Sequence, residues 1–206
     1  MPMKLVLAIA FLLMFPPAAL AAEKPNSRTE AASIEAYLNG LSTLKSRFVQ
    51  TAHDGSQVTG TFMLKRPGRL RFEYDPPVKD FIVADGVFIY YYDGQMKQQS
   101  SALISRSLAD FFLRPNLKLS GDIGIAEIKR AEGLLQSALV QSSDRAAGSL
   151  TLMFTEKPLQ LKKWRIVDAQ GLTTTVELYE TRLRIALKNE LFHYYDPERK
   201  ESLINR

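Results

Sequence analysis

The chain contains no cysteine among its 206 residues. This absence excludes disulfide bonds, catalytic thiols and zinc sites built from thiolates, so the folded state must depend on an ordinary hydrophobic core. It also excludes a lipid anchor attached to a cysteine behind a cleaved leader. The mature protein is therefore expected to be soluble.

Residue patterns suited to catalysis are scarce. The only two histidines, His53 and His193, are far apart in the sequence and make a weak candidate metal site. The chain has no G-x-S-x-G elbow, no H-E-x-x-H helix, no Walker loop and no G-x-G-x-x-G fingerprint. Several aspartates lie in or beside turns, where this residue binds its own backbone: Asp75, Asp80, Asp85 and Asp93. We therefore expect no enzymatic activity, no metal and no cofactor.

No hydrophobic run is long enough to span a membrane comfortably. The longest, from Leu5 to Phe15, is interrupted by Pro16-Pro17, whereas a spanning helix needs about 20 apolar residues. Lys4 precedes this run, and Ala19-Leu20-Ala21 follows it as a small-x-small cleavage motif. The pattern predicts that residues 1–21 are a cleaved signal peptide.

The rest of the chain has the composition of one globular domain, expected over residues 22–206. The whole sequence is 46% hydrophobic and 24% charged, with a net charge of +5. Its basic residues are scattered without a run of five or more like charges, so nucleic-acid binding is not predicted. The densest basic cluster, Arg182, Arg184 and Lys188, alternates with leucine and isoleucine, which is typical of the solvated face of a strand.

Hydrophobic periodicity predicts one helix followed by a long antiparallel meander. Ser27-Arg28-Thr29-Glu30 has the spacing of a capping box, and apolar residues recur at helical spacing after it. From Lys45 onward the period changes to two, and turn residues separate the runs. Strands are expected at about 45–53, 57–66, 69–75, 80–85, 87–93, 95–100, 134–142, 149–155, 160–168 and 172–180, and around 192–195.

Two further helical segments are expected, one over Ser105–Leu113 and one near Ile125–Glu132. Open twisted sheets rarely exceed about ten strands without curling. The predicted fold class is therefore α+β, mainly β: an incomplete antiparallel β-barrel of about 11 strands, with about three short helices covering its open side.

Large apolar side chains share one face of the predicted strands. The pattern is compatible with a filled core and with an apolar cavity, and both interpretations remain open. The candidate lining residues are Phe62, Leu64, Leu70, Phe72, Tyr74, Ile89, Tyr91, Leu152 and Phe154.

Arg66 is the most unusual charged residue of the pattern. It ends a strand before the Pro67-Gly68 turn. Alternate residues of a strand share a face, so Arg66 lies on the same apolar face as Leu64 and Phe62. A guanidinium on an apolar face needs a partner.

Several segments together resemble the LolA family of periplasmic outer-membrane lipoprotein carriers. The resemblance extends over nearly the whole mature chain and is most specific around Lys65-Arg66-Pro67-Gly68. The segments that carry it are Phe48-Val49-Gln50, Gly60 to Leu64, the Lys65-Arg66-Pro67-Gly68 corner with Tyr74 and Pro77, Asp85-Gly86 with the tyrosine-rich strand, and Phe192 to Pro197.

The resemblance implies a fold, a function and partners. Family members have an incomplete barrel whose hydrophobic cavity lies under a helical lid. They bind the acyl chains of lipoproteins released from the inner membrane and deliver them to the outer membrane. The implied partners are acylated lipoproteins, an inner-membrane ABC-type lipoprotein-releasing complex and, if present, an outer-membrane receptor. A periplasmic monomer is expected.

The resemblance also implies a partner for Arg66. The family's arginine at this position hydrogen-bonds to the backbone of the lid and holds it closed until cargo displaces it. Here the lid would comprise Ser107 to Leu113 and the N-terminal helix, with Leu108, Phe111, Phe112 and Leu113 as its apolar residues. The chain departs from several members in having Phe72 where they have tryptophan, and its only tryptophan is Trp164.

Two alternatives remain at this point. A carrier or sensor of another lipid would have the same fold and the same cavity. A periplasmic hydrolase would need carboxylates converging inside the barrel, and the predicted inner face has almost none.

Overall fold

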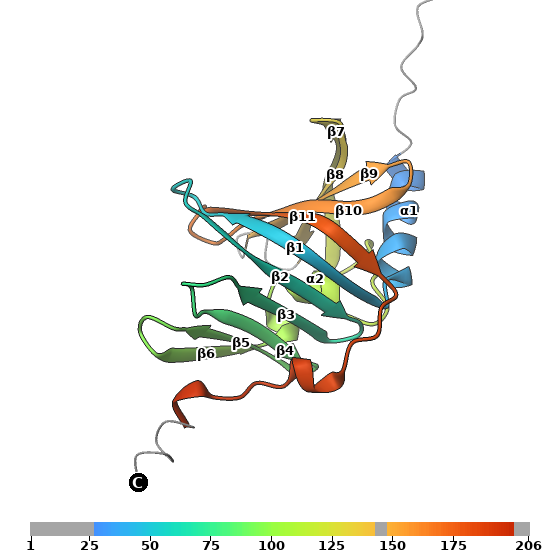
Figure 1. Ribbon diagram of the computed structural model, residues 1–206. Helices are drawn as coiled ribbons and strands as arrows, with labels where there is room; N and C mark the ends of the chain where they lie inside the picture. The colour runs from blue at the N-terminus through green and yellow to red at the C-terminus, as the bar shows by residue number, and fades with distance from the viewer. Residues whose placement is uncertain (1–26, 143–147, 200–206) are drawn as a thin grey trace, which may run out of the picture.

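A computed structural model describes residues 27–142 and 148–199. They form one antiparallel sheet with helical segments against it (Figure 1). The strands are β1 (Thr43–Thr51), β2 (Gln57–Lys65), β3 (Arg69–Tyr74), β4 (Phe81–Asp85), β5 (Phe88–Asp93), β6 (Gln98–Leu103), β7 (Ile123–Ala131), β8 (Leu134–Gln141), β9 (Ser149–Glu156), β10 (Leu159–Val167) and β11 (Thr173–Leu183). The helices are α1 (Ser27–Gly40) and α2 (Asp110–Leu113), and the 3-10 turns are η1 (Ile104–Arg106) and η3 (Asn189–Phe192).

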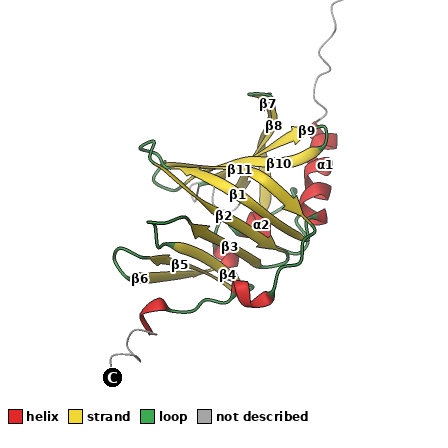
Figure 2. Ribbon diagram, in the orientation of Figure 1, coloured by secondary structure: helices red, strands yellow, loops and turns green. Residues whose placement is uncertain are grey.

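The sheet has 11 strands in the order β6-β5-β4-β3-β2-β1-β11-β10-β9-β8-β7. Each half is a meander, and β11 returns to pair with β1, which joins the two halves. Within the described residues β6 and β7 each pair on one side only, so the sheet curls without closing. Helix α2 lies between the two halves of the curled sheet (Figure 2). The predicted incomplete barrel with helices on its open side is confirmed.

The core lies inside the curl because alternate side chains of each strand point inward. Phe48 on β1 makes edge contacts with the rings of Phe72 and Tyr74 on β3, with centroids 5.3 and 5.5 Å apart. Gly60 on β2 lies directly beneath the Phe48 ring, where an added Cβ would be only 2.7 Å from ring carbons. A glycine at this position therefore lets the Phe48 ring reach across β2 to β3.

Helix α1 is fixed to the second half of the sheet by polar contacts along its length. Glu30 pairs with Arg130 on β7 at 2.6 Å, and Arg130 also binds Glu156 on β9 at 2.8 Å. In the middle of the helix, the Tyr37 hydroxyl accepts a hydrogen bond of 3.0 Å from the Leu161 backbone N–H on β10. These contacts hold α1 against β7 and β10, and none of its residues lines the cavity described below.

The Tyr37→Phe variant is expected to lower the free energy of unfolding by about 1–3 kcal/mol. The change removes the acceptor of the buried Leu161 N–H and leaves it unpaired. Urea unfolding followed by far-UV circular dichroism measures the effect. Tyr195→Phe is the matched control, because Tyr195 is 61% exposed. Equal stability of the two variants would show that the Tyr37 hydroxyl contributes nothing.

The helix predicted near Ile125–Glu132 is wrong, because residues 125–131 belong to β7 and Glu132 lies in the turn that follows. A bulge between Ile125 and Glu127 interrupts the alternation of this strand. Because of the bulge, Ile125 and Ile128 both pack on the core although they are three residues apart in the sequence. A spacing of three between apolar residues is typical of a helix, which explains the wrong prediction.

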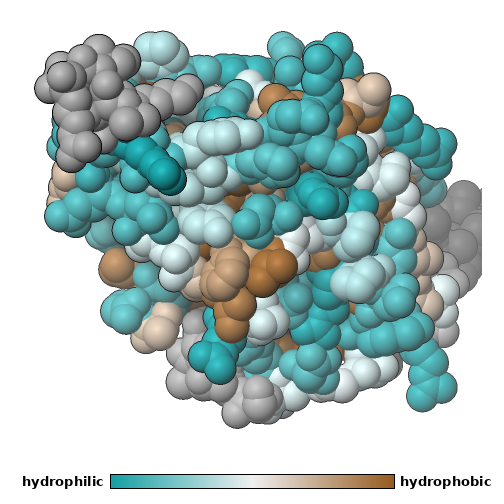
Figure 3. Space-filling model, turned by 90° about the horizontal axis from the view of Figure 1, so that it is seen from below, coloured by the Kyte–Doolittle hydropathy of each residue, from teal (hydrophilic) through white to brown (hydrophobic). Residues whose placement is uncertain are grey.

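The strand predicted around 192–195 is also wrong. Residues Asn189–Phe192 form η3, and the chain then continues without strand pairing. Phe192 is fully buried, and Tyr194 stacks on Tyr90 with centroids 4.7 Å apart. Figure 3 views the molecule from the side on which this segment lies and shows a mainly hydrophilic surface with hydrophobic side chains gathered near its centre. Burial of aromatic rings, and not sheet pairing, explains the apolar pattern here.

The predicted signal peptide, residues 1–21, lies outside the described residues and stays a prediction. In the described part of the chain, no helix has the length and hydrophobicity needed to cross a membrane.

Candidate functional site

A cavity of about 570 Å³ lies inside the curl of the sheet. Both halves of the sheet and the segment ending in α2 contribute to its wall. The wall is mainly apolar and includes Phe62, Leu70, Phe72, Ile82, Ile89, Phe112, Leu150, Trp164, Ile166 and Val176. Such a volume lies within the range of about 300–1,000 Å³ typical of ligand sites.

The structure brings most of the candidate lining residues together. Phe62, Leu70, Phe72, Tyr74, Ile89 and Tyr91 line the cavity. Leu64, Leu152 and Phe154 point to the same side of the sheet but are completely buried in the core next to the cavity.

The candidate lid residues divide in the same way. Leu108 and Phe112 line the cavity, together with Ser107 and Ala109. Phe111 and Leu113 are each 1% exposed and belong to the core cluster, so they anchor α2 to the body of the protein.

Trp164 is the central lining residue that sequence reasoning did not assign to the cavity. Its ring makes edge contacts with Phe62 and Phe112, with centroids 5.3 Å apart in both cases, and lies 6.2 Å from the ring of Phe72. The alternation over 160–168 places Trp164 and Ile166 on one face of the strand. This pattern could have identified both residues as candidates for the cavity wall. The cavity of this chain therefore has a tryptophan next to Phe72, supplied by a different strand.

Two hydrogen-bonded pairs bring polar groups into the cavity wall. The Tyr74 hydroxyl donates to Gln50 Oε1 at 3.0 Å, and the Tyr91 hydroxyl donates to Asp80 Oδ2 at 2.9 Å. Burial raises the pKa of Tyr74 to about 12. Burial and the nearby Asp80 carboxylate also raise the pKa of Tyr91. Both phenols are therefore neutral hydrogen-bond donors at pH 7.

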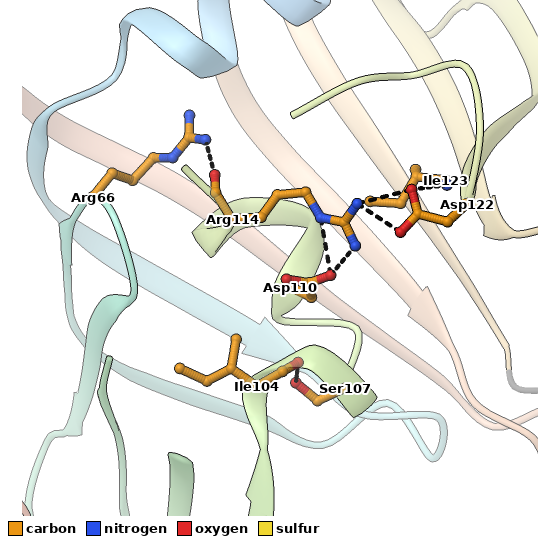
Figure 4. A network of polar contacts seen from close by, with 7 residues as sticks. All are labelled: Arg66, Ile104, Ser107, Asp110, Arg114, Asp122 and Ile123. Carbon is orange, nitrogen blue, oxygen red and sulfur yellow. Dashed lines mark hydrogen bonds and ion pairs between the residues drawn. The ribbon is translucent and has the colours of Figure 1, made fainter. Parts of the chain in front are cut away.

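Arg66 extends from the end of β2 toward the end of α2 (Figure 4). Its Nη2 donates to the carbonyl oxygen of Arg114 and lies 3.5 Å from Asn39 Oδ1 on α1. Its Nε and Nη1 are buried and have no hydrogen-bond partner within the described residues. Burial lowers the pKa of Arg66. The guanidinium is thus held in an apolar setting by a contact to the backbone at the end of α2.

The end of α2 is fixed at further points. The Gly68 N–H donates to the Leu113 carbonyl at 2.9 Å, next to the Arg66 contact. The Arg114 side chain binds Asp110 within α2 and Asp122 at 2.8 Å, as Figure 4 shows. The corner between β2 and β3 and this ion-pair network therefore set the position of α2 over the cavity.

Arg47 and Asp75 form an ion pair on the outer face of the sheet. Arg47 Nη1 donates to Asp75 Oδ1 at 2.9 Å, Nη2 donates to Oδ2, and the Thr59 hydroxyl donates to Oδ2 at 2.6 Å. These bonds lower the pKa of Asp75 to about 2. An unpaired aspartate in an unfolded chain has a pKa of about 3.9.

The Asp75→Asn variant is expected to show a weaker loss of stability in acid than the native protein. Because the folded state lowers the pKa of Asp75, its pairing stabilises the fold above about pH 4, and this stabilisation is lost as the pH falls toward about 2. Thermal unfolding between pH 2 and pH 7 measures the difference. Parallel curves for the two proteins would contradict the prediction.

Among the described residues, no group of three or more histidine, aspartate or glutamate side chains is placed to hold a metal ion.

The model of the family described as outer membrane lipoprotein carrier protein LolA matches residues 39–195. The chain belongs to the LolA family. The matched LolA region contains all the described strands, α2 and both partners of the contact between Arg66 and Arg114.

Individual LolA relatives are similar over most of their length. A protein of Methylococcus capsulatus is 26% identical over 180 residues, covering 82% of this chain and 85% of the relative. One from Legionella pneumophila (strain Paris) is 25% identical over 180 residues, with coverages of 84% and 88%. One from Azotobacter vinelandii is 28% identical over 173 residues, with coverages of 78% and 81%. Each is named outer-membrane lipoprotein carrier protein.

Proposed function

We propose that this LolA protein carries acylated lipoproteins through the periplasm from the inner to the outer membrane, with their acyl chains bound in the cavity. The observation that carries the proposal is the apolar cavity between the two halves of the sheet, partly covered by α2. Membership of the LolA family and the names of the relatives support it. The protein acts by binding and release, not by catalysis.

The size of the cavity implies that α2 moves when cargo binds. A cavity of about 570 Å³ suits a drug-sized ligand, and the three acyl chains of a triacylated lipoprotein are bulkier than that. We expect Ser107 to Phe112 to shift outward, since this part of the wall belongs neither to a strand nor to a turn between paired strands.

The contact of Arg66 with Arg114 opposes this movement. A hydrogen bond to a charged group contributes roughly 1.5–3 kcal/mol. Each buried methylene contributes about 0.8 kcal/mol to binding, so the acyl chains displace the contact readily. The contact lowers the affinity enough to let the chains leave again. Arg66 therefore acts as a reversible latch on α2.

The proposed route needs partners at both membranes. An ABC-type complex of the inner membrane releases the lipoprotein to the carrier, and a receptor at the outer membrane, where present, accepts it. The carrier itself is expected to be a monomer with a single cavity.

The test is release of a newly synthesised lipoprotein from inner-membrane spheroplasts by the purified mature protein. We expect a soluble one-to-one complex with the acylated cargo and none with an unacylated version of the same cargo. Failure to release the acylated cargo, together with retained binding of a fluorescent lipid, would contradict the lipoprotein route and leave a carrier of another lipid.

A further inference from the structure

The charged side chains in the described part of the cavity wall are all acidic. Among the described residues that line it are two aspartates, Asp80 and Asp168, and no lysine, arginine or histidine. Asp80 precedes β4, and Asp168 follows β10, so the two carboxylates come from opposite halves of the sheet.

Both aspartates lie at the same end of the cavity. The turns β1–β2, β3–β4 and β10–β11 meet at one end of the sheet, because Thr51 of β1 faces both Gln57 of β2 and Thr175 of β11. Exposure increases toward these turns, from 2% at Trp164 to 44% at Leu172. This end is therefore the mouth, through which a head group would project into solvent.

Each carboxylate is held in place by hydrogen bonds that leave part of it available. Asp80 accepts from the Tyr91 hydroxyl and from the Gly94 N–H, both at 2.9 Å. Asp168 Oδ1 accepts from the N–H groups of Gln170 and Leu172, also at 2.9 Å. A carboxylate has about four acceptor positions, and each of these uses two. The carboxylates are thus held at the mouth, and none of the described lining residues is a cation that would neutralise them.

We propose that Asp80 and Asp168 make the cavity selective by charge, so that it accepts acyl chains with a neutral or cationic head group and rejects anionic lipids. The inference rests on the proposed acyl-binding function and adds its specificity. An anionic head at the mouth is repelled by two fixed carboxylates, in a setting less polar than water where such repulsion is stronger. A lipoprotein joins its acyl chains to the polypeptide through uncharged ester and amide groups, so it meets no such penalty.

The selection matters because the membranes that supply lipoproteins also contain anionic lipids. A cavity selective only for hydrophobicity would take up any acyl chain that reached it. A fixed charge at the mouth instead discriminates by penalising the unwanted ligand, without an added contact to the wanted one.

The test compares ligands with one dodecyl chain and different head groups: dodecyl maltoside, dodecyltrimethylammonium and dodecanoate, each below its micelle concentration. Binding is followed at pH 7 and low salt by the fluorescence of Trp164, the only tryptophan and a lining residue. In the native protein, we expect dodecanoate to bind about tenfold more weakly than dodecyl maltoside. High salt should narrow the difference.

The double variant Asp80→Asn with Asp168→Asn is expected to lose this discrimination, so that dodecanoate binds to it about as tightly as dodecyl maltoside does. Asparagine retains an acceptor for the turn N–H groups, so the fold is preserved. Asp54→Asn is the matched control, because Asp54 lies at the same end of the sheet and does not line the cavity.

Two results would overturn the inference. One is equal binding of dodecanoate and maltoside by the native protein, and the other is a difference that the double variant leaves intact. If dodecyl maltoside itself does not bind, the proposed acyl-binding function is wrong, and the selectivity falls with it.

Discussion

The Arg66→Leu variant is expected to bind acylated lipoprotein but to transfer it to an acceptor about tenfold more slowly than the native protein. The contact between Arg66 Nη2 and the Arg114 carbonyl favours the position of α2 that excludes cargo. Without this contact, the closed, empty state is less stable relative to the cargo-bound state, so the lifetime of the cargo-bound state rises. Transfer from the purified complex to outer-membrane vesicles, followed over time, measures the effect.

The same variant should be at least as stable as the native protein. Two of the three guanidinium nitrogens of Arg66 are buried without a partner among the described residues, and leucine removes that burial penalty. Arg66→Lys is the control, because it keeps the charge but has a single donor group in place of the planar fork. A native transfer rate for Arg66→Leu would remove the residue from the mechanism.

The Trp164→Ala variant is expected to lose about 3–5 kcal/mol of unfolding free energy and most of its acyl binding. Trp164 is 2% exposed and is in contact with the rings of Phe62 and Phe112. Its removal leaves a void that joins the cavity, so the wall loses both its support and its largest apolar surface. Urea unfolding by far-UV circular dichroism and displacement of a fluorescent lipid measure the two effects.

Trp164→Phe is the matched variant, since it keeps a ring in contact with both partners. We expect it to lose about 1 kcal/mol and to retain lipid binding. If the alanine and phenylalanine variants behave alike, the ring at this position does not support the cavity.

The strand boundaries were predictable because the turns are local. Pro67-Gly68 and Asp85-Gly86 separate alternating runs, and the structure places the ends of β2, β3, β4 and β5 within one residue of the predicted bounds. The β7 strand was missed because its bulge hides the alternation from any local reading of the sequence.

The cavity was only partly predictable. Alternation specifies which face of the sheet a side chain lies on, but not whether that side chain borders the cavity or is buried in the core. Leu64 and Leu70 are paired directly across β2 and β3 and share a face, yet only Leu70 reaches the cavity, since Leu64 is completely buried among core side chains. Trp164 joins Phe62 only through the pairing of β11 with β1, which brings together residues about a hundred positions apart in the chain. Non-local pairing of this kind has no signature in a single sequence.

The partner of Arg66 illustrates a third case. The residues alone indicated that a guanidinium on an apolar face needs an acceptor, and the resemblance supplied the place to look. The structure adds that the acceptor is the Arg114 carbonyl and that the Arg114 side chain is held by Asp110 and Asp122.

Among the described residues, β6 and β7 each have one edge that pairs with no other strand, which affects the range of guests that the proposed carrier can hold. In a closed barrel, the number of strands and their stagger fix the radius, so a larger guest must break ladder hydrogen bonds. Here the two edges are free to part, and the girth can increase through small changes of twist spread over ten strand pairs. An open barrel of this kind can thus hold guests of different volume without breaking hydrogen bonds between its strands.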